Sequence, residues 1–354
     1  MREVSGIAAR LARRATQLRE LELLQEKEPL PHFPSYISYE RLRRALLLKE
    51  AFLNEFAGAQ LEELYRSAEV EGDLGRVLRL EDSVWQGLSF PDRRRSSEAL
   101  TTQLRLLYGI GPATERALRA QGNRTIADLM THPRFGPAAA QLLQALQQGD
   151  LRRLKAEVER WFTASHPLTL ALTGLAEGRL AFFDLESLGL LGRPLVWFGL
   201  SRTMDEGLLI EQYVIRSITE ERAALVAAAE ALEQASALVT YNGRAFDVNY
   251  LEERLSYYGL YRPVDRPNFD LLYHARRRFR EVLPDCRLET VERHVLGIER
   301  PFDLPSALVP DFYNTYLEER NIGPLVAIIE HNKQDLVSLA ALLSKLCSGL
   351  IYLE

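Results

Sequence analysis

Hydrophobic positions along the chain recur with different periods in three successive stretches. In the first, residues 1–98, apolar side chains recur every three to four positions over 7–25 and 39–65, which predicts helices. A Gly-Asp turn signal between short apolar runs then predicts a small strand pair over 68–81. We therefore expect a mainly helical N-terminal region, to which the sequence assigns no chemistry.

The second stretch, residues 99–147, predicts short helices over 100–107 and 113–120, joined by a tight turn at 108–112. The turn reads Tyr-Gly-Ile-Gly-Pro: glycine permits a positive φ, and proline suits the start of a helix. Ile110 is expected to pack between the two helices. The N–H groups at the start of the second helix would then point outward, where a phosphate oxygen can bind.

This turn resembles the helix-hairpin-helix motif of DNA-binding proteins, whose hairpin holds backbone phosphate without reading the base sequence. The resemblance implies that Gly109, Ile110 and Gly111 contact nucleic acid. Residues 125–146 resemble a degenerate second copy, in which Phe135 replaces the first glycine. The alternative is a helical hairpin whose glycines only cap helices.

The third stretch, residues 168–354, alternates between strand and helix periods. The predicted strands are 179–185, 195–202, 208–216 and 237–241, and the predicted helices are 220–235, 246–258, 287–296 and 322–346. Thr219 is the expected N-cap of the first of these helices. Three strands followed by helix, strand and helix are the order of a ribonuclease-H-like fold, an α/β domain with a mixed sheet flanked by helices.

Five side chains of this stretch are candidates for metal-dependent chemistry. Asp184 and Glu186 lie two positions apart on the first strand, so both carboxylates face the same way. Two charges on an apolar strand need compensation, and hard oxygen ligands suit Mg²⁺ or Mn²⁺. Asp247 follows a buried strand and a glycine-containing turn, on the first turn of a helix. His331 and Asp335, four positions apart, project from one face of the last helix.

These blocks resemble the DEDD (DnaQ-like) exonuclease superfamily and, more closely, the YprB-like ribonuclease-H-like domain family. The resemblance covers about residues 168–350. The motifs that carry it are Asp184-Leu185-Glu186, Asn242-Gly243 with Phe246-Asp247, 287–292, 296–298, 303–305 and 331–336. It implies two-metal hydrolysis of phosphodiester bonds in the 3′ to 5′ direction, with release of nucleoside 5′-monophosphates.

The resemblance also implies a role for each polar residue. Asp184 would bridge two Mg²⁺ or Mn²⁺ ions, Glu186 and Asp335 would complete the first site, and Asp247 would act on the second. His331 would orient or deprotonate the attacking water. Its spacing to Asp335 is that of the superfamily branch in which a tyrosine holds this place.

Further side chains are candidates for nucleic-acid binding, because they belong to a family motif or to an arginine-rich helix that could line a groove beside the site. They are Asn242, Phe246, Arg276, Arg277 and Arg280. Asp270 is one more candidate acid, but it is expected instead to cap the helix that runs to residue 280.

Composition narrows the class of protein. A chain with 47% hydrophobic and 26% charged residues is ordinary and globular, and no run of 18 apolar residues predicts a membrane span. Cys286 and Cys347 are the only cysteines, which excludes a disulfide framework and favours the cytoplasm. The net charge of −5 does not give the overall basic field of a typical nucleic-acid-binding protein. It does not exclude such a protein, because carboxylates gathered around metal ions would add negative charge locally.

Two alternatives to a DNA exonuclease remain. One is a DNA-binding scaffold with a catalytically silent ribonuclease-H-like domain, and the other is an exoribonuclease of the same chemistry. Only the hairpin segment favours DNA over RNA as the nucleic-acid partner, with single-stranded DNA or a frayed 3′ end as the preferred substrate. The sequence indicates no particular protein partner.

Overall fold

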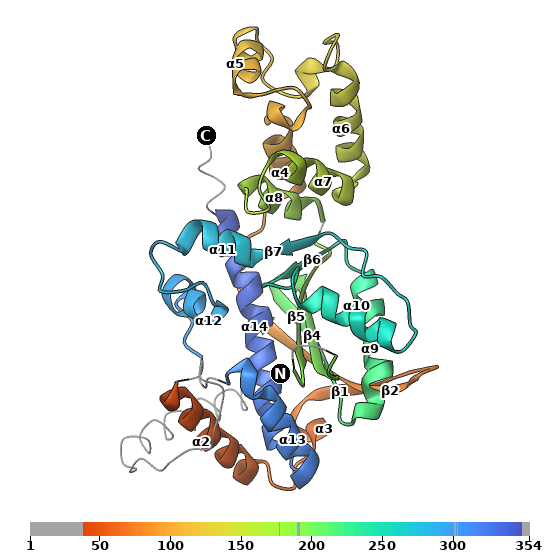
Figure 1. Cartoon of the computed structure of the whole chain (residues 1–354), viewed down its shortest axis with the longest axis vertical. Coiled ribbons are helices and arrows are strands. Elements are labelled where there is room, and N and C mark those ends of the chain that lie inside the picture. Colours follow the sequence, from red (N-terminus) through yellow and green to blue (C-terminus); the bar gives the residue numbers. More distant parts are fainter. Residues whose placement is uncertain (1–37, 177, 190–191, 301, 303, 349–354) are drawn as a thin grey trace.

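The computed structural model describes residues 38–176, 178–189, 192–300, 302 and 304–348. The predicted helix over 7–25 lies outside these residues, as does Asp303 of the predicted 303–305 motif. Figure 1 shows a group of small helices standing on a larger body that contains the sheet. Among the described residues, none of the helices combines the length and the apolar character of a membrane span.

A mixed sheet of seven strands, ordered β1-β2-β5-β4-β3-β6-β7, forms the centre of the larger body. The strands are β1 Arg66–Gly72, β2 Gly75–Trp85, β3 Leu180–Ser187, β4 Leu195–Met204, β5 Gly207–Val214, β6 Ala237–Thr240 and β7 Asn268–Asp270. Strands β3, β4 and β5 form an antiparallel meander, while β6 and β7 continue the sheet in parallel with β3. The predicted ribonuclease-H-like order of strands is confirmed.

Helices cover both faces of this sheet. Helices α2 (Tyr39–Glu55), α13 (Val309–Glu319) and α14 (Gly323–Ser348) pack on one face, and α9 (Glu221–Glu233) and α10 (Asp247–Tyr257) on the other. The alternation of side chains along β4 explains the division: Trp197 belongs to the first core, and its neighbour Phe198 to the second. The remaining α-helices are α3 Leu61–Leu64, α4 Arg93–Thr101, α5 Pro112–Ala120, α6 Gly136–Gln148, α7 Leu151–Trp161, α8 Pro167–Ala171, α11 Leu271–Phe279 and α12 Leu288–Val291.

The predicted strand pair over 68–81 is confirmed as the hairpin of β1 and β2, and it is part of the main sheet. Strand β2 pairs with β5 from Leu78 to Trp85. The helix predicted over 39–65 is two helices, α2 and α3, because the chain turns between them at Gly58, whose φ is +77°. The first and third predicted stretches therefore share one sheet.

The predicted helix over 100–107 is wrong. Helix α4 begins after the N-cap Asp92, so the exposed arginines of 93–95 lie on its first turn. It ends at Thr101, and a separate 3-10 turn covers Leu104–Leu106. The hydroxyls of Thr101 and Thr102 donate to carbonyls one turn back, at 2.8 Å each, which favours termination at this point.

The turn that follows matches the prediction only in part. Gly109 adopts a φ of +84°, as expected, but Gly111 has an extended backbone that any residue adopts. Ile110 is buried, and helix α5 begins at Pro112, as predicted. In the region resembling a second copy, Ile126 is buried as well.

Two predicted caps have different outcomes. Thr219 does not cap α9, whose N-cap Glu220 makes no side-chain capping bond; Ser217 accepts a hydrogen bond at the preceding 3-10 turn instead. Asp270 caps α11, since its carboxylate accepts a hydrogen bond of 3.0 Å from the N–H of Leu272.

The helix predicted over 287–296 is α12 followed by a π-helical turn at Glu292–Leu296.

Candidate active site

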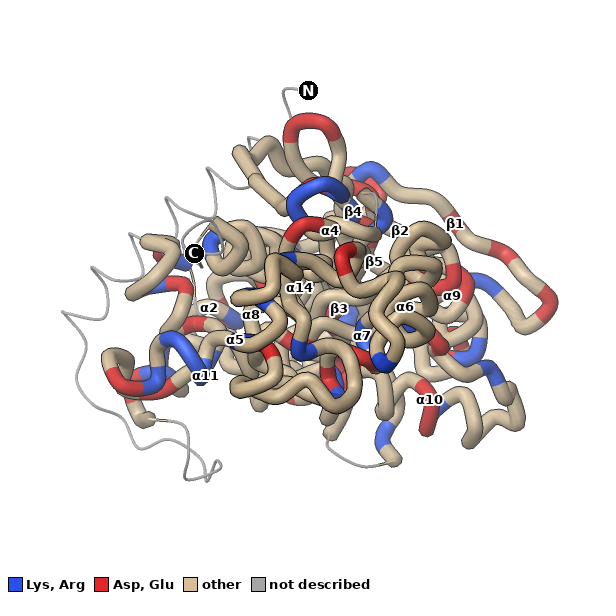
Figure 2. The backbone as a smooth tube through the Cα atoms, turned by 90° about the horizontal axis from the view of Figure 1, so that it is seen from above, with Lys and Arg blue, Asp and Glu red and all other residues tan. Residues whose placement is uncertain are grey.

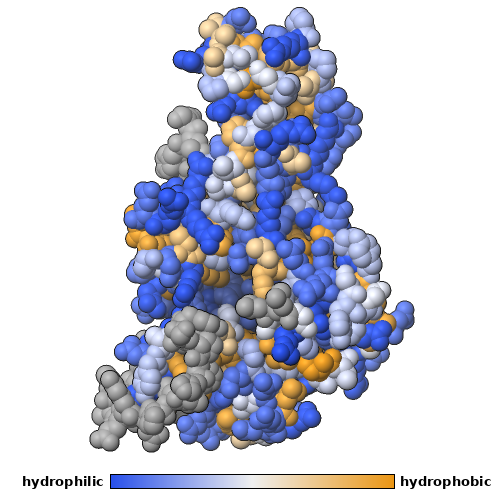
Figure 3. All heavy atoms as spheres, viewed as in Figure 1, coloured by the Kyte–Doolittle hydropathy of each residue, from blue (hydrophilic) through white to orange (hydrophobic). Residues whose placement is uncertain are grey.

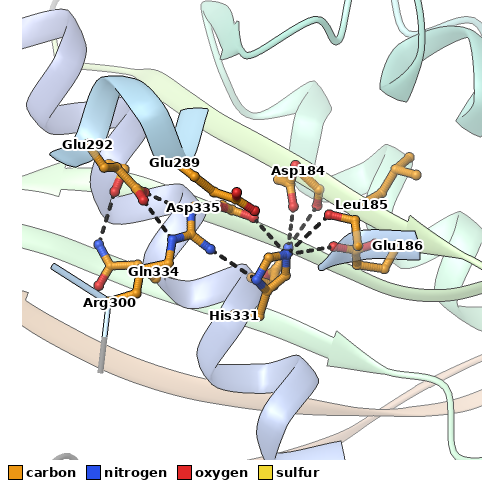
Figure 4. A network of polar contacts seen from close by, with 12 residues as sticks. Asp184, Leu185, Glu186, Glu289, Glu292, Arg300, His331, Gln334 and Asp335 are labelled. Carbon is orange, nitrogen blue, oxygen red and sulfur yellow. Dashed lines mark hydrogen bonds and ion pairs between the residues drawn. The ribbon is translucent and has the colours of Figure 1, made fainter. Parts of the chain in front are cut away.

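The predicted catalytic residues on β3 and α14 meet where the helix crosses the strand. Figure 4 shows Asp184 and Glu186 on the strand directed toward His331 and Asp335 on the helix. The Nε2 atom of His331 lies 3.4 Å from Oε1 of Glu186 and 3.3 Å from Oδ2 of Asp335. Ligand atoms of these three buried residues lie within 4.8 Å of one another, which is a suitable arrangement for a metal ion.

Asp184 is held by a residue whose role the sequence did not reveal. The amide Nδ2 of Asn332 donates to Oδ2 of Asp184 at 2.8 Å. The oxygen of that amide accepts a hydrogen bond of 2.9 Å from Gln212 on β5, so the orientation of the fully buried Asn332 is fixed. The signal in the sequence was its place beside His331 in the 331–336 motif, and its partner on β5 could not be inferred.

Gly199 on β4 makes room for this asparagine. It is the register partner of Asp184, and a Cβ atom at this position would collide with Oδ1 of Asn332 and lie 2.9 Å from Leu336. We expect Gly199→Ala to destabilise the protein by about 1–3 kcal/mol through overpacking. Urea unfolding measures this loss. The matched change Gly87→Ala, where a Cβ meets nothing within 4 Å, should leave stability nearly unchanged; an equal loss would contradict the explanation.

Asp247 lies at the start of α10, next to β3. Its Oδ1 accepts a hydrogen bond of 3.3 Å from the N–H of Leu185, between the two acids of β3. The turn before it requires Gly243, where a Cβ atom would lie 2.5 Å from Thr240. Asp270 accepts a 2.8 Å hydrogen bond from the N–H of Asn242 and so holds the same turn. Asp270 thus supports the turn that positions Asp247.

The electrostatics of the site show an excess of negative charge. Partial burial raises the pKa of Asp184 well above its usual value, and the carboxylates of Asp335, Asp247 and Glu186 raise it further. Burial raises the pKa of Asp247 to about 7 and also raises that of Glu186. For His331, burial alone would lower the pKa, but the carboxylates of Asp335 and Glu186 outweigh it and raise the pKa. Such a cluster favours the binding of cations.

Arg300 and Glu292 are further residues of the site. Glu292 belongs to the 287–292 motif but had no predicted role, and the sequence did not indicate Arg300. The buried guanidinium of Arg300 donates to both oxygens of Glu292, at 2.6 and 2.7 Å, and also to Asp335. Its Nη1 lies 3.0 Å from Nδ1 of His331. Arg300 therefore neutralises part of the local charge and fixes two of the predicted catalytic side chains.

A cleft of about 620 Å³ opens beside these residues. Of the predicted site residues, it is lined by Asp184, Asn242, Arg276, His331 and Asp335. Phe246, Arg277 and Arg280 are not among its lining residues; the ring of Phe246 packs against Tyr250 instead, with centroids 5.2 Å apart. The lining also includes Arg41 of α2, which pairs with Glu289 at 2.6 Å, so α2 takes part in forming the cleft.

The comparisons agree with this fold. Residues 181–347 match the model of the RNase_H superfamily, in agreement with the observed order of strands. The chain is 30% identical over 194 residues to the uncharacterized protein YprB of Bacillus subtilis. This match covers 53% of the chain and 47% of the relative, so the chain spans about half of that relative's length.

Two solved structures are similar at lower identity. A family B DNA polymerase from the hyperthermophilic archaeon Pyrobaculum calidifontis shares 20% identity over 49% of this chain and 25% of its own, with a TM-score of 0.40. Exonuclease I without ligand shares 19% identity over 42% of this chain and 46% of its own, with a TM-score of 0.26.

The raised carboxylate pKa values predict how stability depends on pH. Without divalent ions, the contribution of Asp247 is fully present below the unfolded pKa near 4 and is lost as pH rises through its folded value of about 7. Urea unfolding in EDTA should therefore give a lower free energy at pH 8 than at pH 5. Mg²⁺ or Mn²⁺ at a hundred times its Kd should add about 2.7 kcal/mol at pH 8. Sodium chloride of equal ionic strength is the control, and an equal gain from it would contradict the prediction.

Proposed function

We propose that this chain is a metal-dependent 3′–5′ exonuclease that hydrolyses phosphodiester bonds of single-stranded nucleic acid, with DNA preferred. The observation that carries the proposal is the convergence of four carboxylates, from Asp184, Glu186, Asp247 and Asp335, beside one cleft that arginines also line. The ribonuclease-H-like domain supports a nuclease. The direction of hydrolysis rests on the resemblance to the DEDD superfamily.

The residues present fit divalent cations. Glu186 and Asp335 would hold one ion, with His331 beside them, and Asp184 and Asp247, on adjoining elements, would complete a second site. Carboxylate oxygens are the ligands that Mg²⁺ and Mn²⁺ prefer. When bound, such ions lower the pKa of water and neutralise charge on the scissile phosphate.

The contacts of His331 favour orientation over proton abstraction. A guanidinium has only hydrogen-bond donors, so Nδ1 of a neutral His331 accepts from Arg300 at 3.0 Å. The ring hydrogen then lies on Nε2, which faces Glu186 and Asp335. A ring in this tautomer donates a hydrogen bond into the site and has no free nitrogen there to accept a proton. Our proposal therefore gives His331 the role of orienting water and the neighbouring carboxylates.

The test is a cleavage assay on 5′-labelled single strands of DNA and RNA of the same sequence, with Mg²⁺, Mn²⁺ or EDTA. We expect a metal-dependent ladder that shortens from the 3′ end, faster on DNA. Asp205→Asn, at an exposed acid, is the control variant and should cut normally. Products of 5′-end or internal cleavage would refute the direction, and faster cleavage of RNA would refute the substrate.

The second candidate is a nucleic-acid-binding scaffold without catalysis. The hairpin with Gly109 in a left-handed conformation and the buried Ile110 favours it, because the N-terminus of α5 follows directly. Binding of DNA without cleavage in any divalent ion, lost on changing Gly109 and Gly111, would support the scaffold over the exonuclease.

A further inference from the structure

Two exposed aromatic side chains lie together beside the hairpin. Tyr108, directly before Gly109, is 77% exposed, and Trp161 at the end of α7 is 37% exposed. Their ring centroids lie 5.8 Å apart at an interplanar angle of 40°. The face of the molecule seen in Figure 3 is mostly hydrophilic, with apolar residues in small groups. An exposed aromatic pair of this kind offers a platform on which planar groups can stack.

Basic and aromatic side chains continue from this platform. The guanidinium of Arg105, three residues before Tyr108, lies 5.5 Å from the ring centre of Phe162, the neighbour of Trp161. The Phe162 ring in turn lies 4.2 Å from the ring of His166, which caps α8. The guanidinium of Arg134 lies close to the backbone of the hairpin at Gly109.

The platform and the side chains that continue from it form a strip, made of Tyr108, Trp161, Arg105, Phe162 and His166. Helix α11 connects this strip to the cleft. Its buried His274 contacts Thr169 of α8 at 2.9 Å, and Figure 1 shows α8 directly beside α11. Arg277 lies one turn after His274 on the same helix. Burial lowers the pKa of His166, and the positive charges of Arg277 and Arg105 lower it further, so both arginines act on the strip at His166. The preceding residue, Arg276, lines the cleft. Figure 2 shows the basic stretch at α11.

The chemistry of this strip suits a single-stranded polynucleotide. Exposed bases stack on aromatic side chains, and guanidinium groups bind the phosphates between them. A duplex would present its bases to each other and leave Tyr108 and Trp161 without a role. The strip also runs from the hairpin to the carboxylates, which is the direction a strand must take to be cut at one end.

We propose that Tyr108, Trp161, Arg105, Arg277 and Arg276 form a track that guides a single strand from the hairpin into the cleft. The track deepens the proposed exonuclease function and rests on it for the fate of the bound end. It makes affinity depend on strand length: a short strand fills only the cleft, while a long one also reaches the aromatic pair.

The test measures binding in EDTA, where no strand can be cut. Fluorescence anisotropy with the full chain compares a labelled tetranucleotide with a single strand of about 24 nucleotides. We expect Tyr108→Ala/Trp161→Ala to weaken binding of the long strand by about tenfold or more and to leave the tetranucleotide unchanged. Tyr257→Ala/Tyr261→Ala is the matched control, because these tyrosines are 71% and 85% exposed elsewhere on the surface.

The outcomes separate the track from the nuclease. Loss of long-strand binding in the first variant alone supports the track, even if no cleavage is ever seen. Equal binding by both variants overturns it, even if the enzyme cuts DNA. Tighter binding of duplex than of single strand, weakened by the same variant, would also overturn it. Thermal unfolding of both variants shows whether a loss of binding comes from a loss of the fold, because Trp161 is only 37% exposed.

Discussion

Asp184→Asn should abolish the proposed metal-dependent cleavage while making the metal-free protein more stable. The amide keeps the shape of the side chain but cannot bind a cation as a carboxylate does, so we expect kcat to fall on the order of a thousandfold or more. The charge of Asp184 is unfavourable in the fold, because partial burial and three neighbouring carboxylates raise its pKa. Removing that charge removes the repulsion.

The stability gain should have a defined pH dependence. A raised folded pKa means that the stability contribution of Asp184 is present below the unfolded pKa near 4 and is lost as pH rises. Urea unfolding in EDTA should therefore show the variant to be more stable than the parent at pH 8, with the difference shrinking toward pH 4. A variant that is inactive because it is unfolded would show the opposite sign. Retained cleavage would remove Asp184 from the mechanism.

The sequence predicts those site residues whose positions follow the two-residue repeat of a strand or the repeat of a helix. Asp184 and Glu186 share a strand face, and His331 and Asp335 share a helix face, so each pair follows from spacing alone. Asp247 could be placed because a buried strand and a glycine turn precede it. The order of the strands and helices then indicates which of their ends lie close together. The structure brings all five of these side chains to one place.

Contacts between distant segments could not be predicted. The alternating pattern of the β1–β2 hairpin predicts a strand pair but not its pairing with β5, because backbone hydrogen bonds carry no residue signature. Likewise, nothing near Arg300 in the sequence indicates that it contacts Asp335, thirty-five positions away. The wrong helix over 100–107 has a different cause, since threonine hydroxyls compete locally with the helical pattern.

Arg300→Met should cause a large loss of stability. The change leaves Glu292, whose side chain is 1% exposed, as a buried carboxylate without its cation. Breaking a buried ion pair in this way costs about 3–5 kcal/mol. Asp335 and His331 also lose a contact that fixes them, so we expect metal affinity or kcat to fall about 10–100-fold. Urea unfolding and cleavage assays below the unfolding temperature measure the two effects.

A matched pair elsewhere separates stability from function. Arg254 and Glu221 form an equally buried ion pair, 3% and 0% exposed, on α10 and α9. Arg254→Met should cost a similar free energy of unfolding, yet leave metal affinity and kcat of the folded protein unchanged. Adding Glu292→Met to Arg300→Met should restore much of the stability, because both charges are then absent. Activity should stay low in that double variant, since Asp335 and His331 still lack the guanidinium that orients them; full recovery would mean that Arg300 serves the fold alone.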